Sequence, residues 1–398
     1  MEYVSLKEVI HIKHGYAFKG EFFTEENTGK LVLTPGNFSL SGGFIPTKKY
    51  TKEEAFPEEF ILKANDLIVT MTDLSKEVDT IGFAALVPSD NKLYLHNQRI
   101  GLVTIISDDF DKSFIYWLMR TKSYQRTIAN TSNGATVHHT SPARIYKYKF
   151  KRISLPTQQK IASILSAYDR LIENNTRRIR LLEQMAENLY KEWFVRFRFP
   201  EHEKVEMING LPKGWNKEKL DNIADVCMGS SPKSEYYNDE KKGLPFHQGV
   251  GSFGERFVLD NTYSTSYSQI ANPMSILFSV RAPVGRLNYT RNRIAIGRGV
   301  AAINHKEGMQ SLLFYTLKAK FFKEDIVGNG AIFSSITKKE LLKLKLIVPI
   351  KELRVVFNNK INKIDREIDI LYKQNQLLTR QRDLLLPRLM SGKLEVKS

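Results

Sequence analysis

Basic and polar side chains gather in two long stretches of the sequence that contain no acidic residue. The first stretch runs from Lys112 to Tyr168, and the second runs from Asn261 to Lys306. Lysine and arginine neutralise phosphate groups, while asparagine, glutamine, serine and arginine form hydrogen bonds with base edges. Any single arginine here is more simply a solvated surface charge. Taken whole, however, the two stretches predict a surface that faces nucleic acid.

The composition of the whole chain indicates the same kind of partner. The 398 residues include 60 lysines and arginines against 43 acidic residues, which gives a formal net charge of +17. Such an excess favours a polyanionic partner, although a basic protein without one is the alternative that composition leaves open. Cys227 is the single cysteine, so we expect no disulfide within the chain and a cytoplasmic location. No apolar run approaches the roughly 20 residues that span a bilayer.

The sequence lacks the motifs of the enzymes that commonly act on DNA. It contains neither a GxxxxGK[ST] phosphate loop nor a [DN]PP[YF] methyltransferase motif. His138 and His139 have no cysteine or carboxylate close by in sequence, so no zinc site is predicted. The GxGxxG spacing at 249–254 lacks a preceding apolar strand and a following helix, which argues against a dinucleotide site. We therefore expect a protein that reads DNA, catalyses no reaction and holds no metal or cofactor.

The chain contains one internal repeat. The matching residues near the start of each half are Leu6, Val9, Ile12 and Gly15 in the first and Leu220, Ile223, Val226 and Gly229 in the second. Further along, Asn133-Gly134-Ala135 matches Asn329-Gly330-Ala331. Short β-rich runs separated by turn residues, with fewer helical stretches near 112–128 and 308–324, predict a mixed α+β domain in each half.

Each half ends in a segment with heptad spacing. The first seam is Ile161, Leu165, Tyr168, Ile172, Asn175, Ile179, Leu182, Ala186, Leu189 and Trp193, and the second is Phe357, Ile361, Ile364, Ile368, Leu371, Asn375, Leu378, Arg382, Leu385 and Leu389. The alternating steps of four and three are those of a coiled coil, although two helices packed separately on their own domains are the simpler alternative. A helix of roughly 40 residues is about 60 Å long. An antiparallel pair is favoured, because a parallel pair would require the second domain to span that length.

The antiparallel register brings particular residues opposite one another. It places Asn175 against Asn375, and the other facing pairs are Ile179 with Leu371, Trp193 with Phe357, and Leu165 with Leu385. Paired asparagines fix the register of a coiled coil, whereas the alternative is that each asparagine reaches water at the edge of the seam. The residues that we assign to pairing are Ile172, Asn175, Ile179, Leu182, Ile368, Leu371, Asn375 and Leu378.

Several segments resemble the specificity subunits of type I restriction–modification enzymes. Leu211-Pro212-Lys213-Gly214-Trp215 resembles the opening of a second target-recognition domain, and the segment 384–394 resembles the family's C-terminal ending. Residues 272–285 and 296–300 resemble the central strand-and-loop motif and the glycine-rich motif that follows it. Their counterparts in the first domain are residues 65–72 and 97–101. The segments leading into the helices, at 155–159 and 348–353, depart from the Pro-Pro-x-x-Glu-Gln run that is usual in the family.

The resemblance implies an α+β architecture with an internal pseudo-two-fold repeat. Two mixed α/β target-recognition domains would be joined by two long helices that form an antiparallel coiled coil. The boundaries that we predict are 1–153 for the first domain, 154–200 for the first helix, 201–347 for the second domain and 348–398 for the second helix.

The resemblance also implies the partners. Each domain would bind one half of a bipartite site in double-stranded DNA, and the helices would act as a ruler between the halves. Two methylase subunits with S-adenosylmethionine, and restriction subunits with ATP and Mg²⁺, would assemble on the chain. The alternatives are the recognition subunit of a system whose methylase and nuclease share one chain, and a basic coiled-coil scaffold that binds nucleic acid without sequence preference. The predicted DNA-binding residues are Thr70, Thr72, Gln98, Arg99, Asn133, His138, His139, Lys147, His247, Gln248, Arg281, Arg286, Arg291, Arg293, Arg298 and Ser334.

Overall fold

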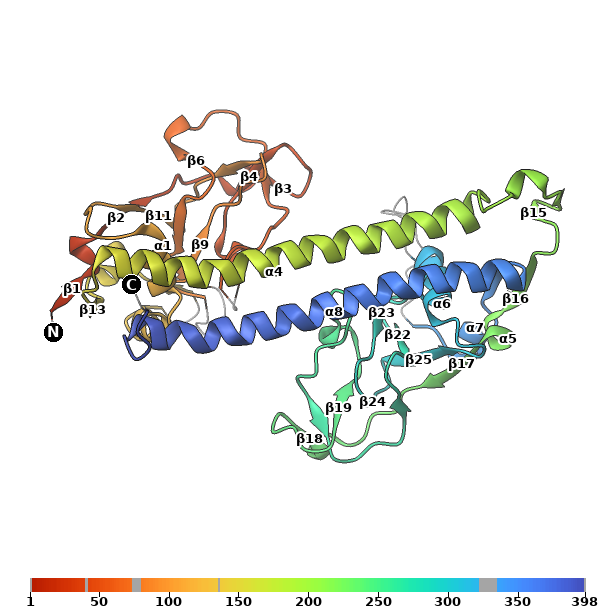
Figure 1. Cartoon of the computed structure of the whole chain (residues 1–398). Coiled ribbons are helices and arrows are strands. Elements are labelled where there is room, and N and C mark those ends of the chain that lie inside the picture. Colours follow the sequence, from red (N-terminus) through yellow and green to blue (C-terminus); the bar gives the residue numbers. More distant parts are fainter. Residues whose placement is uncertain (1, 40–41, 74–79, 135–136, 322–334, 397–398) are drawn as a thin grey trace. The chain divides into compact units, whose positions relative to one another are not determined.

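The computed structural model describes residues 2–39, 42–73, 80–134, 137–321 and 335–396. It divides into two compact units, of which the first holds residues 1–174 and 374–398 and the second holds residues 175–373. Each unit contains one globular domain and part of each of two long helices, α4 (Leu155–Tyr190) and α8 (Lys351–Met390) (Figure 1). Across the described residues, no helix has the length and apolarity that crossing a bilayer requires.

The first domain combines a five-stranded sheet, a four-stranded sheet and two two-stranded pairs with three short α-helices. Its strands are β1 (Tyr3–Ser5), β2 (Ile10–His14), β3 (Phe23–Thr24), β4 (Lys30–Val32), β5 (Tyr50–Thr51), β6 (Ile61–Leu62), β7 (Leu67–Thr70), β8 (Thr72–Asp73), β9 (Ala84–Leu86), β10 (Leu93–Leu95), β11 (Ile100–Ile105), β12 (His138–His139) and β13 (Lys149–Lys151). Its helices are α1 (Lys112–Met119), α2 (Lys122–Asn130) and α3 (Pro142–Ile145). The strand orders are β3-β5-β4-β10-β6 and β2-β11-β7-β9, while β1 pairs with β13 and β8 with β12.

The second domain has the same plan. Its strands are β14 (Met207–Ile208), β15 (Leu211–Pro212), β16 (Asn216–Lys219), β17 (Ala224–Met228), β18 (Tyr237–Asn238), β19 (Leu244–His247), β20 (Tyr263–Ser264), β21 (Ile270–Ala271), β22 (Ile276–Ser279), β23 (Leu287–Tyr289), β24 (Ile294–Ile296), β25 (Val300–His305) and β26 (Lys345–Val348). Its helices are α5 (Leu220–Ile223), α6 (Gln310–Phe321) and α7 (Lys338–Leu342). The strand orders are β18-β20-β19-β24-β21 and β17-β25-β22-β23, with β16 paired to β26 and β14 to β15.

The predicted repeat is confirmed in the five-stranded and four-stranded sheets of each domain and in the pairs β1–β13 and β16–β26. The strand order of the five-stranded sheet is the same in both domains, including the parallel central pair β4–β10 in the first and β19–β24 in the second. The register is shared as well, since Val4 lies opposite Phe150 in β1–β13 and Glu218 lies opposite Leu346 in β16–β26. The fully buried strands β7 and β22 have the sequences LIVT and ILFS, whose β-branched and aromatic residues favour strands. The α+β fold class therefore follows from apolar runs that the sequence already displays.

In the first unit, the beginning of α4 runs antiparallel to the end of α8. The side-chain amide of Asn375 donates a hydrogen bond to the carbonyl oxygen of Ile172 over 3.3 Å, and Arg382 forms an ion pair with Asp169 at 2.6 Å. Asn375 precedes Arg382 on α8, whereas its partner Ile172 follows Asp169 on α4. The two helices therefore run in opposite directions here. Apolar residues of both helices are buried together in the core of this unit: Ile161, Leu165, Leu386 and Leu389.

The second unit contains an antiparallel helix pair of its own. Arg178 on α4 forms an ion pair with Glu367 on α8 at 2.9 Å, and the ring centroids of Trp193 and Phe357 are 5.6 Å apart. The contact between Trp193 and Phe357 is the one that the predicted register requires. Asn175 belongs to this unit and Asn375 to the first, so their pairing stays a prediction.

The ends of the helices are set by local backbone geometry. Helix α4 ends at Tyr190 and is followed by a π-helical turn at Lys191–Val195, so the helix stops short of residue 200, the predicted limit. Phe197 then takes a positive φ of 59°, which redirects the chain toward the second domain. Helix α8 ends at Met390, and Gly392 adopts a φ of 71° just after it. A glycine in this left-handed conformation is a common way to end a helix.

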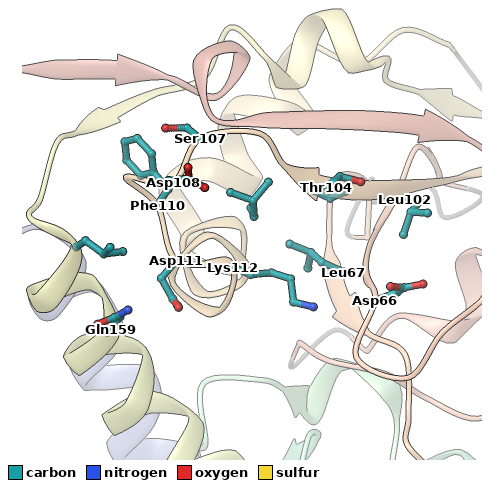
Figure 2. Close-up of a pocket in the computed structure, with 13 residues that line it drawn as sticks. Asp66, Leu67, Leu102, Thr104, Ser107, Asp108, Phe110, Asp111, Lys112 and Gln159 are labelled. Carbon is teal, nitrogen blue, oxygen red and sulfur yellow. The ribbon is translucent and has the colours of Figure 1, made fainter.

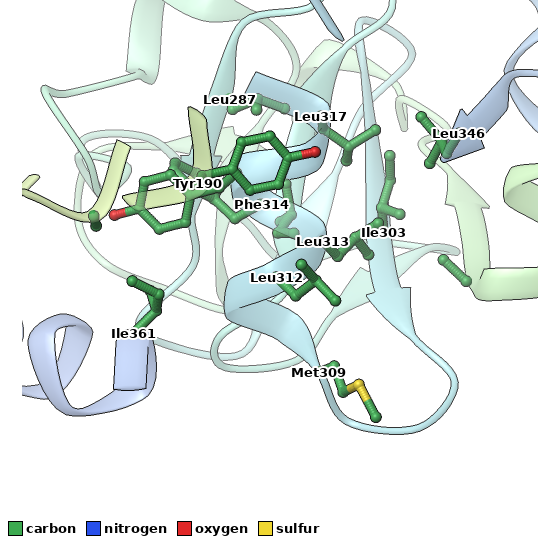
Figure 3. Packing of buried hydrophobic residues seen from close by; sticks show 14 of the residues in the cluster. Tyr190, Leu287, Ile303, Met309, Leu312, Leu313, Phe314, Leu317, Leu346 and Ile361 are labelled. Carbon is green, nitrogen blue, oxygen red and sulfur yellow. The ribbon is translucent and has the colours of Figure 1, made fainter. Parts of the chain in front are cut away.

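The second domain packs against both helices through a large apolar core. Figure 3 shows Tyr190 of α4 and Ile361 of α8 beside Leu312 and Phe314 of α6, with Leu346 of β26 nearby. Burial raises the pKa of Tyr190 to about 12, so this side chain stays neutral in the core. Because residues from both helices belong to the core of the domain, the helices are part of the folded unit and are not a detachable spacer.

A buried arginine links the second domain to both helices. Arg256 is 3% exposed and forms ion pairs with Asp365 of α8 and with Glu183 of α4, the latter at 3.2 Å. Burial disfavours the charged guanidinium, but Tyr315, Asp365 and the other acidic groups around it outweigh this effect and raise the pKa of Arg256. Breaking a buried pair of this kind typically costs about 3–5 kcal/mol, because it leaves an uncompensated charge.

The first unit has an equivalent link with the charges exchanged. Asp169 of α4 binds Arg120, which follows α1, through one carboxylate oxygen and Arg382 of α8 through the other, both at 2.6 Å. Arg120 also donates a hydrogen bond to the hydroxyl of Tyr116 over 2.7 Å. In this unit one carboxylate joins two arginines, whereas in the second unit one arginine joins two carboxylates.

We predict that removal of either ring at the junction of α4 and α8 destabilises the second unit. Trp193→Ala and Phe357→Ala should each lower the free energy of unfolding by about 3–5 kcal/mol, because each leaves a cavity among buried aromatic rings. Urea unfolding followed by circular dichroism measures the effect. Leu181→Ala, at a position that is 51% exposed on α4, is the control and should change stability by no more than about 0.5 kcal/mol. Equal effects at all three positions would contradict the role of the aromatic contact.

Candidate nucleic-acid interface

Four segments of the first domain meet where the parallel strands β4 and β10 end. The amide of Tyr16 donates to the carbonyl of His96 over 2.8 Å, and the amide of Gln98 donates back to the carbonyl of Tyr16 over 2.9 Å. The amide of Met71 donates to the carbonyl of Arg99 over 3.0 Å. The amide of Leu33 donates to the carbonyl of Leu95 over 3.0 Å, which brings in the segment after β4. We call residues 15–18, 33–34, 71–73, 96–99 and 138–140 loop cluster 1.

The short pair of strands β8 and β12 brings in the last segment of loop cluster 1. The Oγ1 of Thr72 lies 3.2 Å from Nδ1 of His139, and the amide of Thr140 donates to the carbonyl of Met71 over 3.0 Å. Asn133 and His139 exchange two backbone hydrogen bonds of 3.0 and 2.8 Å. The structure thus brings together several predicted DNA-binding residues that are distant in sequence: Thr72, Gln98, Arg99, Asn133, His138 and His139.

The second domain builds the same arrangement at the ends of β19 and β24. The amide of Ser230 donates to the carbonyl of Ile296 over 2.9 Å, and the amide of Val280 donates to the carbonyl of Gly299 over 2.9 Å. Arg281 and Ser335 form a β-bridge, as Thr72 and His139 do in the first domain. We call residues 229–231, 247–249, 280–281, 296–299 and 335–336 loop cluster 2.

Exposed polar side chains project from loop cluster 2. The hydroxyl of Ser231 donates to Oε1 of Gln248 over 3.3 Å and accepts a hydrogen bond from the amide of Arg298 over 3.0 Å. Gln248, Arg298 and Arg281 are all exposed. An arginine and a glutamine on neighbouring loops offer donors and acceptors that can contact both phosphates and base edges.

Three of the predicted contact residues are buried and support the loops from inside. Thr70 and Thr72 are at most 4% exposed, and the Oγ1 of Thr70 donates to the carbonyl of Thr72 over 2.8 Å. His247 is 1% exposed and lies between Ser252 Oγ and Asp260 Oδ1, each at 2.9 Å from a ring nitrogen. Because these three side chains are buried, the expectation that they contact DNA directly is corrected to one of supporting the loops of the candidate surface.

Asp260 is held ionised beside the buried histidine. Burial opposes ionisation of its carboxyl, but hydrogen bonds from His247 and Asn292 outweigh burial and lower the pKa of Asp260. The Nδ2 of Asn292 donates to the second oxygen of Asp260 over 2.7 Å. The loop after β19 is thereby tied to the turn between β23 and β24.

Arg291 packs against helix α8, a contact that the sequence did not indicate. Its guanidinium pairs with Asp369 of α8 at 2.6 Å and lies 4.3 Å from the ring centroids of both Phe257 and Tyr372. Burial opposes ionisation of Asp369, but Lys373 and Arg291 outweigh it and lower the pKa of that carboxyl. Arg291 therefore anchors the domain on α8, and the prediction that it contacts DNA is corrected.

The remaining predicted residues lie in several places. Arg293 is exposed just before β24, whereas Arg298 follows the end of that strand. Arg286 is exposed next to β23, and its amide donates to Ser279 Oγ over 2.8 Å. Lys147 is exposed in the turn between α3 and β13, outside loop cluster 1. Ser334 and the repeat segment 329–331 lie outside the described residues.

The GxGxxG spacing has a different context from the one predicted. Strand β19 does precede it directly, so the expectation that no strand leads into the motif is wrong. A short 3₁₀ turn at Val250–Ser252 follows in place of a long helix. A dinucleotide pyrophosphate needs the N-terminus of such a helix, so the motif does not form that kind of site. Within the described residues, no three histidine, cysteine or carboxylate side chains are grouped so that they could hold a metal ion.

The first unit also contains a pocket of about 490 Å³, which Figure 2 shows between β7, β11, α1 and α4. Its walls carry the carboxylates of Asp66, Asp108 and Asp111. Two of these carboxylates have structural roles, because Asp66 accepts a hydrogen bond from the amide of Lys63 and Asp111 caps α1. Acidic walls repel phosphate, so this pocket is not part of the candidate DNA surface.

Comparisons with known proteins agree with this architecture. The family model for the type I restriction modification DNA specificity domain matches residues 1–184 and 212–380. Two relatives come from Methanocaldococcus jannaschii. A protein provisionally assigned there as the type I restriction enzyme MjaX specificity subunit is 29% identical over 375 residues, covering 90% of this chain and 86% of its own. The MjaIX specificity subunit is 26% identical over 372 residues, covering 88% and 82%.

A solved structure has the same fold. The type I restriction–modification S subunit from M. genitalium aligns over 100% of this chain and 96% of its own, with a TM-score of 0.60 and 18% sequence identity. Two domains that repeat one loop cluster, each packed on a pair of long helices, define a duplicated recognition protein. The chain belongs to the type I restriction modification DNA specificity domain family.

We predict that a methyl group at Gly15 in loop cluster 1, or at Gly229 in loop cluster 2, lowers the stability of the domain that contains it. A Cβ at Gly15 would lie 2.2 Å from the carbonyl oxygen of Asn97, and one at Gly229 would lie 2.1 Å from that of Gly297. Because backbone has to move, Gly15→Ala and Gly229→Ala should each destabilise the protein by about 1–3 kcal/mol. Chemical denaturation measures this change.

The matched controls are Gly20→Ala and Gly251→Ala, where a Cβ would meet nothing within 4 Å. Both controls should keep the stability of the unchanged protein to within about 0.5 kcal/mol. A stability loss in the controls that matches the loss at Gly15 and Gly229 would show that close packing of the loops is not the cause.

Proposed function

We propose that this chain is the DNA-reading subunit of a type I restriction–modification complex and that it catalyses no reaction itself. The observation that carries the proposal is the loop cluster that occurs twice, at the same sheet edge, with exposed arginine and glutamine side chains in both copies. Each cluster binds one half of a bipartite site in duplex DNA. Membership of the specificity family and the formal net charge of +17 support this function.

The helices serve as a ruler in this proposal. Arg256 of the second domain forms ion pairs with both helices, and Arg120 of the first domain pairs with Asp169 of α4, which also binds Arg382 of α8, so each domain is held on the helices by charge as well as by apolar packing. A rigid connection of this kind fixes the separation and the rotation of the half-sites about the DNA axis. Two sites read from one face of the duplex favour centres about one helical turn apart, roughly 10 base pairs.

The partners supply the chemistry. Two methylase subunits carrying S-adenosylmethionine would dock on the helices and domains and methylate adenine. Restriction subunits with ATP and Mg²⁺ would join this core. The setting is the cytoplasm, where the single cysteine stays reduced. A scaffold that binds nucleic acid without sequence preference would bind random duplexes as well as the methylated site, and competition between the two distinguishes these functions.

We predict that the two half-sites are independent. Replacing residues 1–150 with the first domain of another family member should change one half of the methylated site and leave the other half unchanged. The donor domain should carry an arginine that can pair with Asp169, so that the link to α4 is kept. Sequencing of methylated DNA from host cells gives the result. A change in both halves would contradict independent reading.

We also predict that the helices set the spacer between the half-sites. Seven residues inserted in both helices, near Asn175 and Asn375, preserve the heptad seam and add about 10 Å to each helix, equal to roughly three base pairs of rise. The half-sites should stay the same while the spacer lengthens. Insertion in one helix only is the control and should give a smaller shift. An active complex that keeps the original spacer would mean that the helices are not the ruler.

A further inference from the structure

The two domains carry different side chains at one equivalent position of their loop clusters. Matching residues 97–101 and 296–300 in order would pair Arg99 with Arg298. The backbone hydrogen bonds correct this pairing by one residue. The bond from Tyr16 to His96 corresponds to the one from Ser230 to Ile296. The next three positions therefore pair as 97 with 297, 98 with 298 and 99 with 299.

Two further hydrogen bonds confirm this equivalence. The amide of Ile100 donates to Asn97 over 2.9 Å, as that of Val300 donates to Gly297 over 3.1 Å. In the first domain the amide of Met71 donates to the carbonyl of Arg99. In the second domain the amide of Val280 donates to the carbonyl of Gly299 in the same way. Gln98 in the first domain is therefore equivalent to Arg298 in the second.

Both side chains are presented by a turn that the domain holds in place. The amide of Gln98 is hydrogen-bonded to Tyr16, and the amide of Arg298 is hydrogen-bonded to Ser231. Close packing of Gly15 on residue 97 and of Gly229 on residue 297 fixes the turn from behind. Because the backbone is fixed, the exposed side chain is the variable part of the turn.

The side chain of Arg298 differs from the buried arginines of the protein. Arg120 and Arg256 each pair with a carboxylate of a long helix. Within the described part of the chain, Arg298 forms no ion pair, and it is exposed next to the equally exposed Gln248. Its charge and its five donors are available to a ligand outside the domain.

The next equivalent pair, Arg99 and Gly299, does not allow such a comparison, because only the first domain has room for a side chain there. A Cβ at Gly299 would lie 2.0 Å from the carbonyl oxygen of Gln248, so the second domain accepts only glycine there. In the first domain the segment after β4 differs in sequence, and Arg99 is exposed. Gln98 and Arg298 are equivalent in the backbone, and both side chains are exposed. The side chains of the two domains can therefore be compared directly at this position.

Arginine and glutamine read different bases in the major groove. Arginine makes two hydrogen bonds to O6 and N7 of guanine, and glutamine makes two to N6 and N7 of adenine. Resting on the proposed function, we infer that this turn position reads one base in each half-site. Gln98 contacts an adenine in the half-site of the first domain, and Arg298 contacts a guanine in the half-site of the second.

The test exchanges the two side chains in the full chain, expressed with its methylase subunits in host cells that lack the native gene. Gln98→Arg should convert one adenine of the first half-site to guanine, and Arg298→Gln should convert one guanine of the second half-site to adenine. The opposite half-site should stay unchanged in each case. Sequencing of methylated DNA, together with selection of bound duplexes from a random library, gives both motifs.

Two more variants separate base reading from charge and from folding. Arg298→Ala should relax one position, with a loss of preference for guanine of about 5- to 150-fold. Arg293→Gln removes an exposed arginine at the other end of β24, outside loop cluster 2, and should leave the selected DNA motif unchanged. Thermal melting of each purified variant shows whether the fold is retained.

The outcomes distinguish this inference from the function on which it rests. If the unchanged protein selects a bipartite site and folded Gln98→Arg and Arg298→Gln variants select the same bases, the inference is wrong while the proposed function stands. Loss of preference at every position in folded variants would also overturn it, because a base-reading residue affects one position. If the unchanged complex selects no sequence, the proposed function itself fails.

Discussion

Buried charges that must be paired fix the geometry of this protein. Arg256 is surrounded by the second domain and the two helices, and its guanidinium is balanced only where Asp365 and Glu183 reach it together. In the first unit, Asp169 forms ion pairs with both Arg120 and Arg382, so these two buried arginines depend on a position at which Asp169 reaches them together. Moving a domain on its helices would leave a charge buried without a partner, at a cost of several kcal/mol. The orientation of each loop cluster relative to its helices follows from this requirement.

The fold was accessible from the sequence because its signals are periodic. Heptad steps from Ile161 to Trp193 and from Phe357 to Leu389 marked both helices, and the matching apolar residues at the start of each half marked the repeat. The contact between Trp193 and Phe357 followed from the register alone. Patterns of this kind depend on neighbours at fixed spacing, which a single sequence displays directly.

The candidate site was less accessible, because burial and charge pairing depend on contacts that are distant along the chain. The acid-free stretch around Arg291 suggested a free cation, but its partner Asp369 lies 78 residues away on α8. His247 looked like a polar loop residue, although Ser252 and Asp260 enclose it. Arg256 and Asp365 were not singled out, since nothing local marks either one. The pairing of Gln98 with Arg298 required backbone hydrogen bonds, because the connecting loops of the two domains differ in length.

The composition of the first unit has a consequence for how the chain is made. Its core includes Leu386 and Leu389, which the ribosome adds only after the whole of residues 175–373. The second unit is continuous in sequence, so all of its core residues have been synthesised before the last core residues of the first unit, which lie on α8. The usual order, in which the N-terminal domain completes its fold first during synthesis, is therefore reversed. Until α8 arrives, the nascent first domain exposes the apolar side of α4 around Ile161 and Leu165, and a chain released early would carry that surface uncovered.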